Sequence, residues 1–128
     1  MTTTFRNATR VERVTDTFDT LGESAIWCTR DAVLYWVDIR APALRRFDPA
    51  TGETSTWPLP DLCGAVMLAQ DKRLLLAMRT GVFRFDPDTQ ALEPLVAPEP
   101  ESLGNRLTDS KCDRRGRLWT SSMRDFGA

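Results

Sequence analysis

The stretch Leu44–Pro60, "LRRFDPATGETSTWPLP", recurs in altered form at Val82–Pro98, "VFRFDPDTQALEPLVAP". The two copies share an R-F-D-P-x-T core, at Arg46–Thr51 and Arg84–Thr89, and the cores lie 38 residues apart. An Asp-Pro pair forms turns, because the Asp side chain bonds the backbone ahead of it and Pro fixes its own φ. A repeat of roughly 40 residues is the length of one four-stranded propeller blade.

Short apolar runs accompany the repeat and predict strands. They stand behind charged turns at Arg30–Ile39, Gln70–Arg79 and Arg114–Met123, and few segments show helical spacing. The sequence therefore predicts an all-β fold, a β-propeller of which about two and a half blades are present. The alternative is a chance repeat in a generic β-sandwich. The expected strands are 24–28, 33–39, 43–48 and 54–59 in the first blade, 63–69, 73–79, 81–86 and 91–96 in the second, 107–113 and 117–123 in the third, and 10–15 as a strand that completes the last blade of a closed ring.

Composition limits the classes of partner. The chain has 128 residues, 41% of them hydrophobic and 27% charged, with a net charge of −1. This charge gives no reason to expect nucleic acid or an anionic membrane as a partner. No apolar run approaches the ~20 residues that span a bilayer, and the first residues have no apolar signal core. Three scattered cysteines without a CxxC pair predict buried free thiols in a reducing compartment, so we expect a cytoplasmic protein.

Histidine is absent from the sequence. A Ser-His-Asp or Cys-His relay and a His-ligated zinc site are therefore excluded in this chain. A metal here would need oxygen or thiolate ligands. Because the cysteines are scattered, oxygen ligands and a hard cation such as calcium or magnesium are favoured.

Three motifs in order resemble the senescence marker protein, regucalcin and gluconolactonase family. The resemblance runs from about Leu21 to Met123, most of the chain, and the motifs keep the family's spacing. The matching residues are Leu21-Gly22-Glu23-Ser24 with Trp27, then Val37-Asp38-Ile39, and then Asn105-Arg106, Asp109, Lys111, Asp113, Gly116-Arg117, Trp119 and Met123.

This resemblance implies a six-bladed propeller with one divalent metal cation (calcium, zinc, magnesium or manganese) in its channel. Residues 1–128 then form the N-terminal portion of a single, incomplete propeller domain. The family's first metal ligand corresponds to Glu23, whose alternative role is that of a turn carboxylate. An Asn and an Asp much further along complete the metal site, and that Asp is the proposed proton-transfer group. Their positions lie beyond Ala128, so no catalytic residue is assigned in this chain.

The resemblance also implies that Arg106 and Thr108 contact a sugar lactone. A guanidinium suits this role because its planar donors can grip ring and carbonyl oxygens. The alternative for Arg106 is a structural salt bridge to Asp109 or Asp113. The family pattern is N-R-x-N-D-G-K, so Thr108 replaces the usual Asn and Ser110 the usual Gly.

An acidic substrate contact of some family members falls near Phe126, which cannot replace a carboxylate. The neighbouring Asp125 is expected to face the other way, because side chains alternate along a strand. The four tryptophans are expected to pack in the core between blades, and Cys112 is expected to be buried.

Three functions remain open. The first is metal-dependent hydrolysis of a sugar lactone by the complete protein, with this segment inactive by itself. The second is a related propeller esterase or phosphotriesterase. The third is a non-catalytic calcium- or ligand-binding propeller, or an inactive product.

Overall fold

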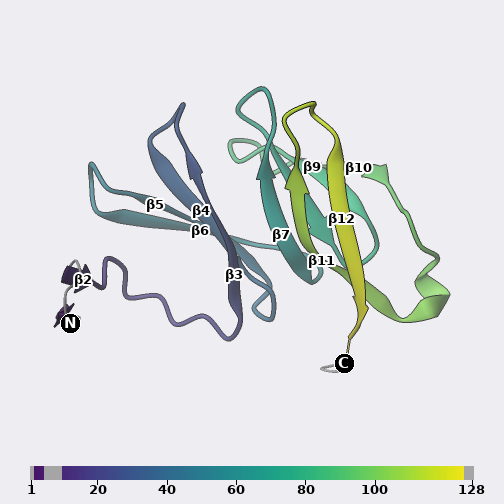
Figure 1. The fold of residues 1–128 in the computed structure, drawn as a ribbon, viewed down its shortest axis with the longest axis horizontal. Helices are drawn as coiled ribbons and strands as arrows, with labels where there is room; N and C mark the ends of the chain where they lie inside the picture. The colour runs from purple at the N-terminus through teal and green to yellow at the C-terminus, as the bar shows by residue number, and fades with distance from the viewer. Residues whose placement is uncertain (1, 5–9, 126–128) are drawn as a thin grey trace.

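The computed structural model describes residues 2–4 and 10–125. Two four-stranded antiparallel sheets follow one another along the chain, and a two-stranded sheet comes after them (Figure 1). We call these sheets the first, second and third blades. The first blade contains β3 (Gly22–Cys28), β4 (Val33–Asp38), β5 (Ala43–Asp48) and β6 (Glu53–Pro58); the second contains β7 (Cys63–Leu68), β8 (Leu74–Met78), β9 (Val82–Phe85) and β10 (Leu92–Val96); the third contains β11 (Asn105–Cys112) and β12 (Leu118–Arg124).

Three short elements lie outside the blades. Strand β1 (Thr2–Thr4) pairs antiparallel with β2 (Arg10–Glu12), and a 3-10 turn, η1 (Glu101–Leu103), leads into β11. The strand predicted at 10–15 is therefore shorter than expected, and it pairs with β1. In the described part of the chain, no helix is long and apolar enough to cross a lipid bilayer.

The repeated R-F-D-P core forms the same turn in both blades. The Gly52 amide donates to the Asp48 carbonyl over 2.8 Å, and the Gln90 amide donates to the Asp86 carbonyl over 2.7 Å. Each Asp carboxylate also accepts the amide two residues ahead, at 2.8 Å and 2.9 Å. Both closing residues have a positive φ, 75° at Gly52 and 63° at Gln90. The all-β, blade-by-blade fold that the repeat predicts is confirmed.

Two apolar clusters hold the blades together. The larger joins the first and second blades and includes the fully buried Leu44 and Leu76. The smaller joins the second and third blades through Met67, Val82 and Leu107. Burying each side chain of this size contributes roughly 1.5–3 kcal/mol. Face-to-face packing of blades is therefore the main apolar contribution to the fold.

The structure corrects three of the burial predictions. Trp36 is 9% exposed, and Trp57 packs edge-on against a phenylalanine of the second blade, as expected. In contrast, Trp27 and Trp119 are 47% and 62% exposed. Cys112 is exposed as well. These side chains lie on strand surfaces that no described blade covers.

The buried carboxylate of Asp38 ties the segment before β3 to the turn after β4. One oxygen accepts the Thr20 amide at 2.9 Å, and the other accepts the amides of Leu21, Arg40 and Ala41 at 3.1 to 3.3 Å. Burial disfavours the charged form, but the four amides outweigh burial, and the pKa of Asp38 lies below its ordinary value. The V-D-I motif therefore fixes where β3 begins.

The backbones of the second and third blades approach each other closely at Gly64. A Cβ at this position would lie 2.4 Å from the Leu107 carbonyl oxygen and 2.8 Å from the Thr108 Cα. Both atoms belong to the backbone of β11, which cannot yield as a flexible side chain could. Glycine at this position therefore sets the distance between β7 and β11.

Replacing Asp38 by Asn should lower the free energy of unfolding of the full-length polypeptide by about 2–4 kcal/mol, because the new amide places a donor against backbone donors. A depressed pKa stabilises the folded state above about pH 4, and this contribution disappears as the pH falls through the folded pKa. Denaturant unfolding at several pH values measures the free energy of unfolding of the unmodified protein and of Asp38→Asn. The two values should converge as the pH falls toward about 2. Asp48→Asn is the control, since Asn can still accept at that turn. An equal loss in both variants would contradict the role of Asp38.

Gly64→Ala should destabilise the fold by about 1–3 kcal/mol or more through overpacking. Gly52→Ala is the comparison: nothing lies within 4 Å of its Cβ, but its φ of 75° should cost about 1–2 kcal/mol by itself. Thermal unfolding of both variants measures the difference. The interpretation fails if Gly64→Ala unfolds at the temperature of the unmodified protein.

Candidate functional site

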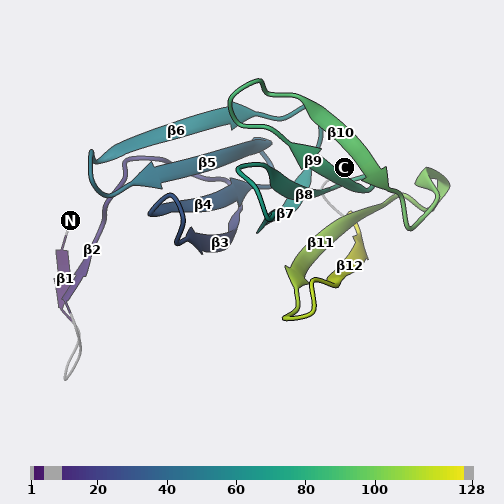
Figure 2. The ribbon, with the colours of Figure 1, turned by 90° about the horizontal axis from the view of Figure 1, so that it is seen from above.

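The first strand of each blade contributes to one surface. Strands β3, β7 and β11 lie side by side (Figure 1), and β6 and β10 run along the opposite side of the molecule (Figure 2). The three predicted site residues, Glu23, Arg106 and Thr108, all come from these inner strands. The blade repeat therefore brings the predicted residues onto strands that line the same surface.

Each inner strand has a register irregularity in its first half. The shift lies between Glu23 and Ile26 in β3, between Cys63 and Ala65 in β7, and between Leu107 and Ser110 in β11. Such β-bulges change the direction of a side chain and are frequent beside functional sites. The predicted residues lie at or just before these bulges.

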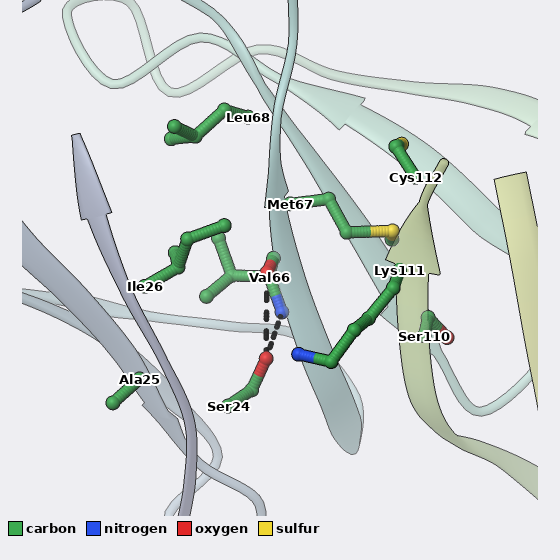
Figure 3. A pocket seen from close by; sticks show the side chains of 9 residues that line it. All are labelled: Ser24, Ala25, Ile26, Val66, Met67, Leu68, Ser110, Lys111 and Cys112. Carbon is green, nitrogen blue, oxygen red and sulfur yellow. Dashed lines mark hydrogen bonds between the residues drawn. The ribbon is translucent and has the colours of Figure 1, made fainter. Parts of the chain in front are cut away.

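Ser24 links the bulge of β3 to the second blade. Its φ is 61°, in the left-handed region, which strains a residue with a side chain. Its hydroxyl oxygen accepts the Val66 amide at 3.0 Å and donates to the Val66 carbonyl at 3.3 Å (Figure 3). A serine side chain thus satisfies both backbone groups of Val66, and it holds the residue next to Glu23 against β7.

A cavity of about 180 Å³ lies between the three inner strands (Figure 3). The side chain of Lys111 points from β11 across this cavity toward Ser24 and Val66 (Figure 3). One side of the cavity is therefore polar and cationic, and the other is aliphatic, which suits a small ligand with both kinds of surface. The lining residues are Ser24, Ala25, Ile26, Val66, Met67, Leu68, Ser110, Lys111 and Cys112.

Glu23 is exposed on β3, opposite Val37 of β4. Among the described residues, no group of three His, Cys, Asp or Glu side chains is close enough to hold a metal ion. Calcium takes six to eight oxygen ligands and magnesium six. The described residues therefore do not form a complete site of this kind by themselves, and the ligand role of Glu23 stays a prediction.

The side chain of Arg106 is only 5% exposed. Its Nη1 donates to the Leu107 carbonyl at 3.4 Å, while its Nε lies 3.8 Å from an Asp125 oxygen and has no hydrogen-bond partner among the described residues. Asp125 is therefore its charged neighbour, in place of Asp109 or Asp113. Thr108 is half-buried at the bulge of β11. Their substrate contacts stay predictions, and Phe126 lies outside the described residues.

Asp113 has a structural role in the hairpin between β11 and β12. The Trp119 indole N–H donates to its carboxylate at 3.0 Å, and Arg117 donates through both its amide and its Nε. The Trp119 bond, followed by the Arg117 amide, lowers the pKa of Asp113 to about 2. The Asp113 carboxylate is therefore ionised at neutral pH, and both of its oxygens are bonded within the hairpin.

Sequence reasoning missed two participants. Arg40, just after β4, forms an ion pair with Asp125, and Asp125 was expected to face away from the site. The two residues are 85 positions apart. No local sequence pattern signals such a contact.

Comparisons with known proteins identify the family of this chain. The family profile described as "SMP-30/Gluconolactonase/LRE-like region" matches residues 21–128. L-arabinolactonase of Azospirillum brasilense is 39% identical over 114 residues, which cover 88% of this chain and 37% of that protein. The 6-deoxy-6-sulfogluconolactonase of Pseudomonas putida is 35% identical over 103 residues, which cover 80% of this chain and 35% of that protein.

Solved structures give the same result. A calcium-binding protein, regucalcin, from Agrobacterium tumefaciens superposes with a TM-score of 0.81 at 26% identity, covering 87% of this chain and 38% of that one. A luciferin-regenerating enzyme superposes with a TM-score of 0.78 at 23% identity, which supports the fold alone. The chain spans about 35–38% of the length of these relatives. Because the family profile covers residues 21–128 and includes all three motifs, the chain belongs to the SMP-30/gluconolactonase/LRE-like family.

Proposed function

We propose that residues 1–128 are the N-terminal portion of a propeller that hydrolyses a sugar lactone with the help of a divalent cation. The observation that carries this proposal is the position of Glu23, Arg106 and Thr108 at the bulged first halves of inner strands. Family membership and relatives named as lactonases support the reaction class. The chain spans little more than a third of those relatives, so the activity belongs to the whole protein.

Glu23 is the metal ligand that this segment contributes. Its exposed carboxylate fits a hard cation, and calcium is supported by a solved regucalcin that is named a calcium-binding protein. Zinc, magnesium and manganese fit the same oxygen donor. When bound, such a cation polarises a lactone carbonyl and lowers the pKa of a bound water. The remaining ligands and the proton-transfer carboxylate come from the part of the protein that lies outside this chain.

Arg106 and Thr108 orient the sugar. The guanidinium offers several N–H donors in one plane, which suits ring and carbonyl oxygens. The Thr108 hydroxyl can donate one hydrogen bond to a sugar oxygen and accept another, but it lacks the separate donor and acceptor of an amide. We therefore assign substrate choice among lactones in part to Thr108.

We assign the protein to the cytoplasm, because a reducing compartment keeps cysteines as free thiols. Cys28 and Cys63 are buried and unpaired, and burial raises the pKa of Cys63 to about 12. A thiol with this pKa is protonated at neutral pH, and a protonated thiol is a poor nucleophile.

A calcium-binding propeller without hydrolytic activity is the second candidate. One specific observation favours it: the solved structure with a TM-score of 0.81 is named only as a calcium-binding protein, regucalcin. Both candidates use Glu23 in the same way. They differ in whether a lactone is consumed.

Glu23→Gln in the full-length polypeptide should reduce kcat/KM for aldonolactone hydrolysis by about 100-fold or more, since a bound cation supplies several kcal/mol of transition-state stabilisation. A pH-stat assay of six-carbon and five-carbon aldonolactones, with and without added cation, measures this loss. Glu53→Gln is the matched control, because Glu53 is an exposed carboxylate on the outer strand β6.

Equal activity of Glu23→Gln and the control would contradict the ligand role. If the unmodified polypeptide binds calcium, as measured by calorimetry, but consumes no lactone, the second candidate is correct.

A further inference from the structure

Three charged residues from separate parts of the chain meet beside the inner strands. They are Arg40 after β4, Arg106 near the start of β11 and Asp125 after β12. Arg40 Nη1 lies 3.3 Å from Asp125 Oδ2, and Arg40 Nη2 pairs with Asp125 Oδ1. The same Oδ1 lies 3.8 Å from Arg106 Nε. One carboxylate thus serves two guanidinium groups, one from the first blade and one from the third.

Burial makes this carboxylate important for Arg106. The side chains of Arg106 and Asp125 are 5% and 6% exposed. A buried cation without a counter-charge is strongly unfavourable, because it loses its hydration. In the described part of the chain, Asp125 is the only acidic residue that forms an ion pair with Arg106. The carboxylate therefore compensates the charge of the arginine that is proposed to hold the sugar.

Arg106 does not bond to Asp125 through two parallel contacts, because Arg40 shares this carboxylate. Arg40 makes the close contacts with Asp125, so Arg106 makes a longer one, and its Nε has no hydrogen-bond partner in the described part of the chain. An arginine bonded to a carboxylate through two parallel contacts would have two of its five N–H donors fixed by that carboxylate. Here the Arg106 guanidinium is held near Asp125 by charge and by one long contact, so its position depends on that carboxylate.

Arg40 connects this cluster to the segment that carries Glu23. The Arg40 amide donates to Asp38 at 3.1 Å, and Asp38 also accepts the Leu21 amide, two residues before Glu23. A continuous set of contacts therefore runs from Leu21 through Asp38, Arg40 and Asp125 to Arg106. At one end of this set, Leu21 lies two residues before the predicted metal ligand, Glu23. At the other end, Arg106 is the predicted sugar contact.

We propose that Asp125 is a positioning residue for substrate binding, which fixes the guanidinium of Arg106 and, through Arg40, sets its place relative to the blade of Glu23. This inference rests on the proposed role of Arg106 in binding a sugar lactone. Asp125 itself does not touch the lactone.

The test uses the full-length polypeptide with Asp125→Asn, and with Asp125→Glu as the conservative variant. Asp61→Asn is the control, because Asp61, before β7, forms an ion pair at 2.9 Å with Arg79, after β8, and neither residue forms one with Arg106 in the described structure. For Asp125→Asn we expect the KM for the lactone to rise about tenfold or more with a smaller change in kcat, since a displaced binding group loses uniform binding. Asp125→Glu should recover part of the loss, and Asp61→Asn should leave KM unchanged.

A second readout does not depend on activity. In a ¹⁵N-arginine spectrum, the Nε–H signal of Arg106, assigned with Arg106→Lys, should shift in Asp125→Asn and stay in place in Asp61→Asn. Arg40→Gln removes the competing donor and should also move that signal, which keeps the test decisive if Asp125→Asn does not fold. If the unmodified polypeptide consumes no lactone, the proposed function fails and the spectrum alone decides the role of Asp125. An Arg106 signal that stays in place in every Asp125 and Arg40 variant, or a KM for Asp125→Asn equal to that of Asp61→Asn, overturns the proposal.

Discussion

The carboxylate of Asp38 is the contact on which the arrangement of the first blade depends. It accepts four backbone amides, two from the segment before β3 and two from the turn after β4. Without it, four part-buried amide donors would lose this acceptor, and the start of β3 would lose its anchor. Glu23 follows directly from this anchor. The side chain of Arg40, whose amide also bonds to Asp38, extends to Asp125 in the third blade.

Contacts between blades then place the inner strands. Ser24 forms hydrogen bonds with both the amide and the carbonyl of Val66. Gly64 has no Cβ, so the backbone of β11 can lie where a Cβ would clash with it. These contacts are polar or steric, and they act in a defined direction, whereas the apolar clusters favour burial without specifying a register. The bulges at the same points turn side chains out of the regular alternation. The place of each inner strand in its blade, the apolar packing between blades and the β-bulges together bring three strands onto one surface.

Much of this fold can be predicted from the sequence because its causes are local. The R-F-D-P turn depends on Asp, Pro and a residue with positive φ within seven positions, so it appears in the sequence twice. Strand bounds follow from the same turns. Exposure of Trp27 and Trp119 could not be predicted, because it depends on which strand surfaces another blade covers.

The candidate site was only partly predictable for a similar reason. Glu23, Arg106 and Thr108 came from a resemblance in motifs, while the partner of Arg106 was missed. Asp125 was expected to face away because side chains alternate in a strand, but β12 ends at Arg124, so the alternation no longer applies. Its partner Arg40 is 85 residues away, and only the folded blades bring the two together.

The central claim is that Glu23 and Arg106 serve one site on the inner strands. A crystal structure of the full-length polypeptide, grown with manganese and a sugar lactone and measured with anomalous scattering, tests it most directly. We expect an anomalous peak at about 2.0–2.6 Å from a Glu23 oxygen. We also expect a sugar oxygen within hydrogen-bond distance of Arg106, about 2.7–3.2 Å. A cation bound elsewhere, with Glu23 in solvent and the sugar remote from Arg106, would contradict the account.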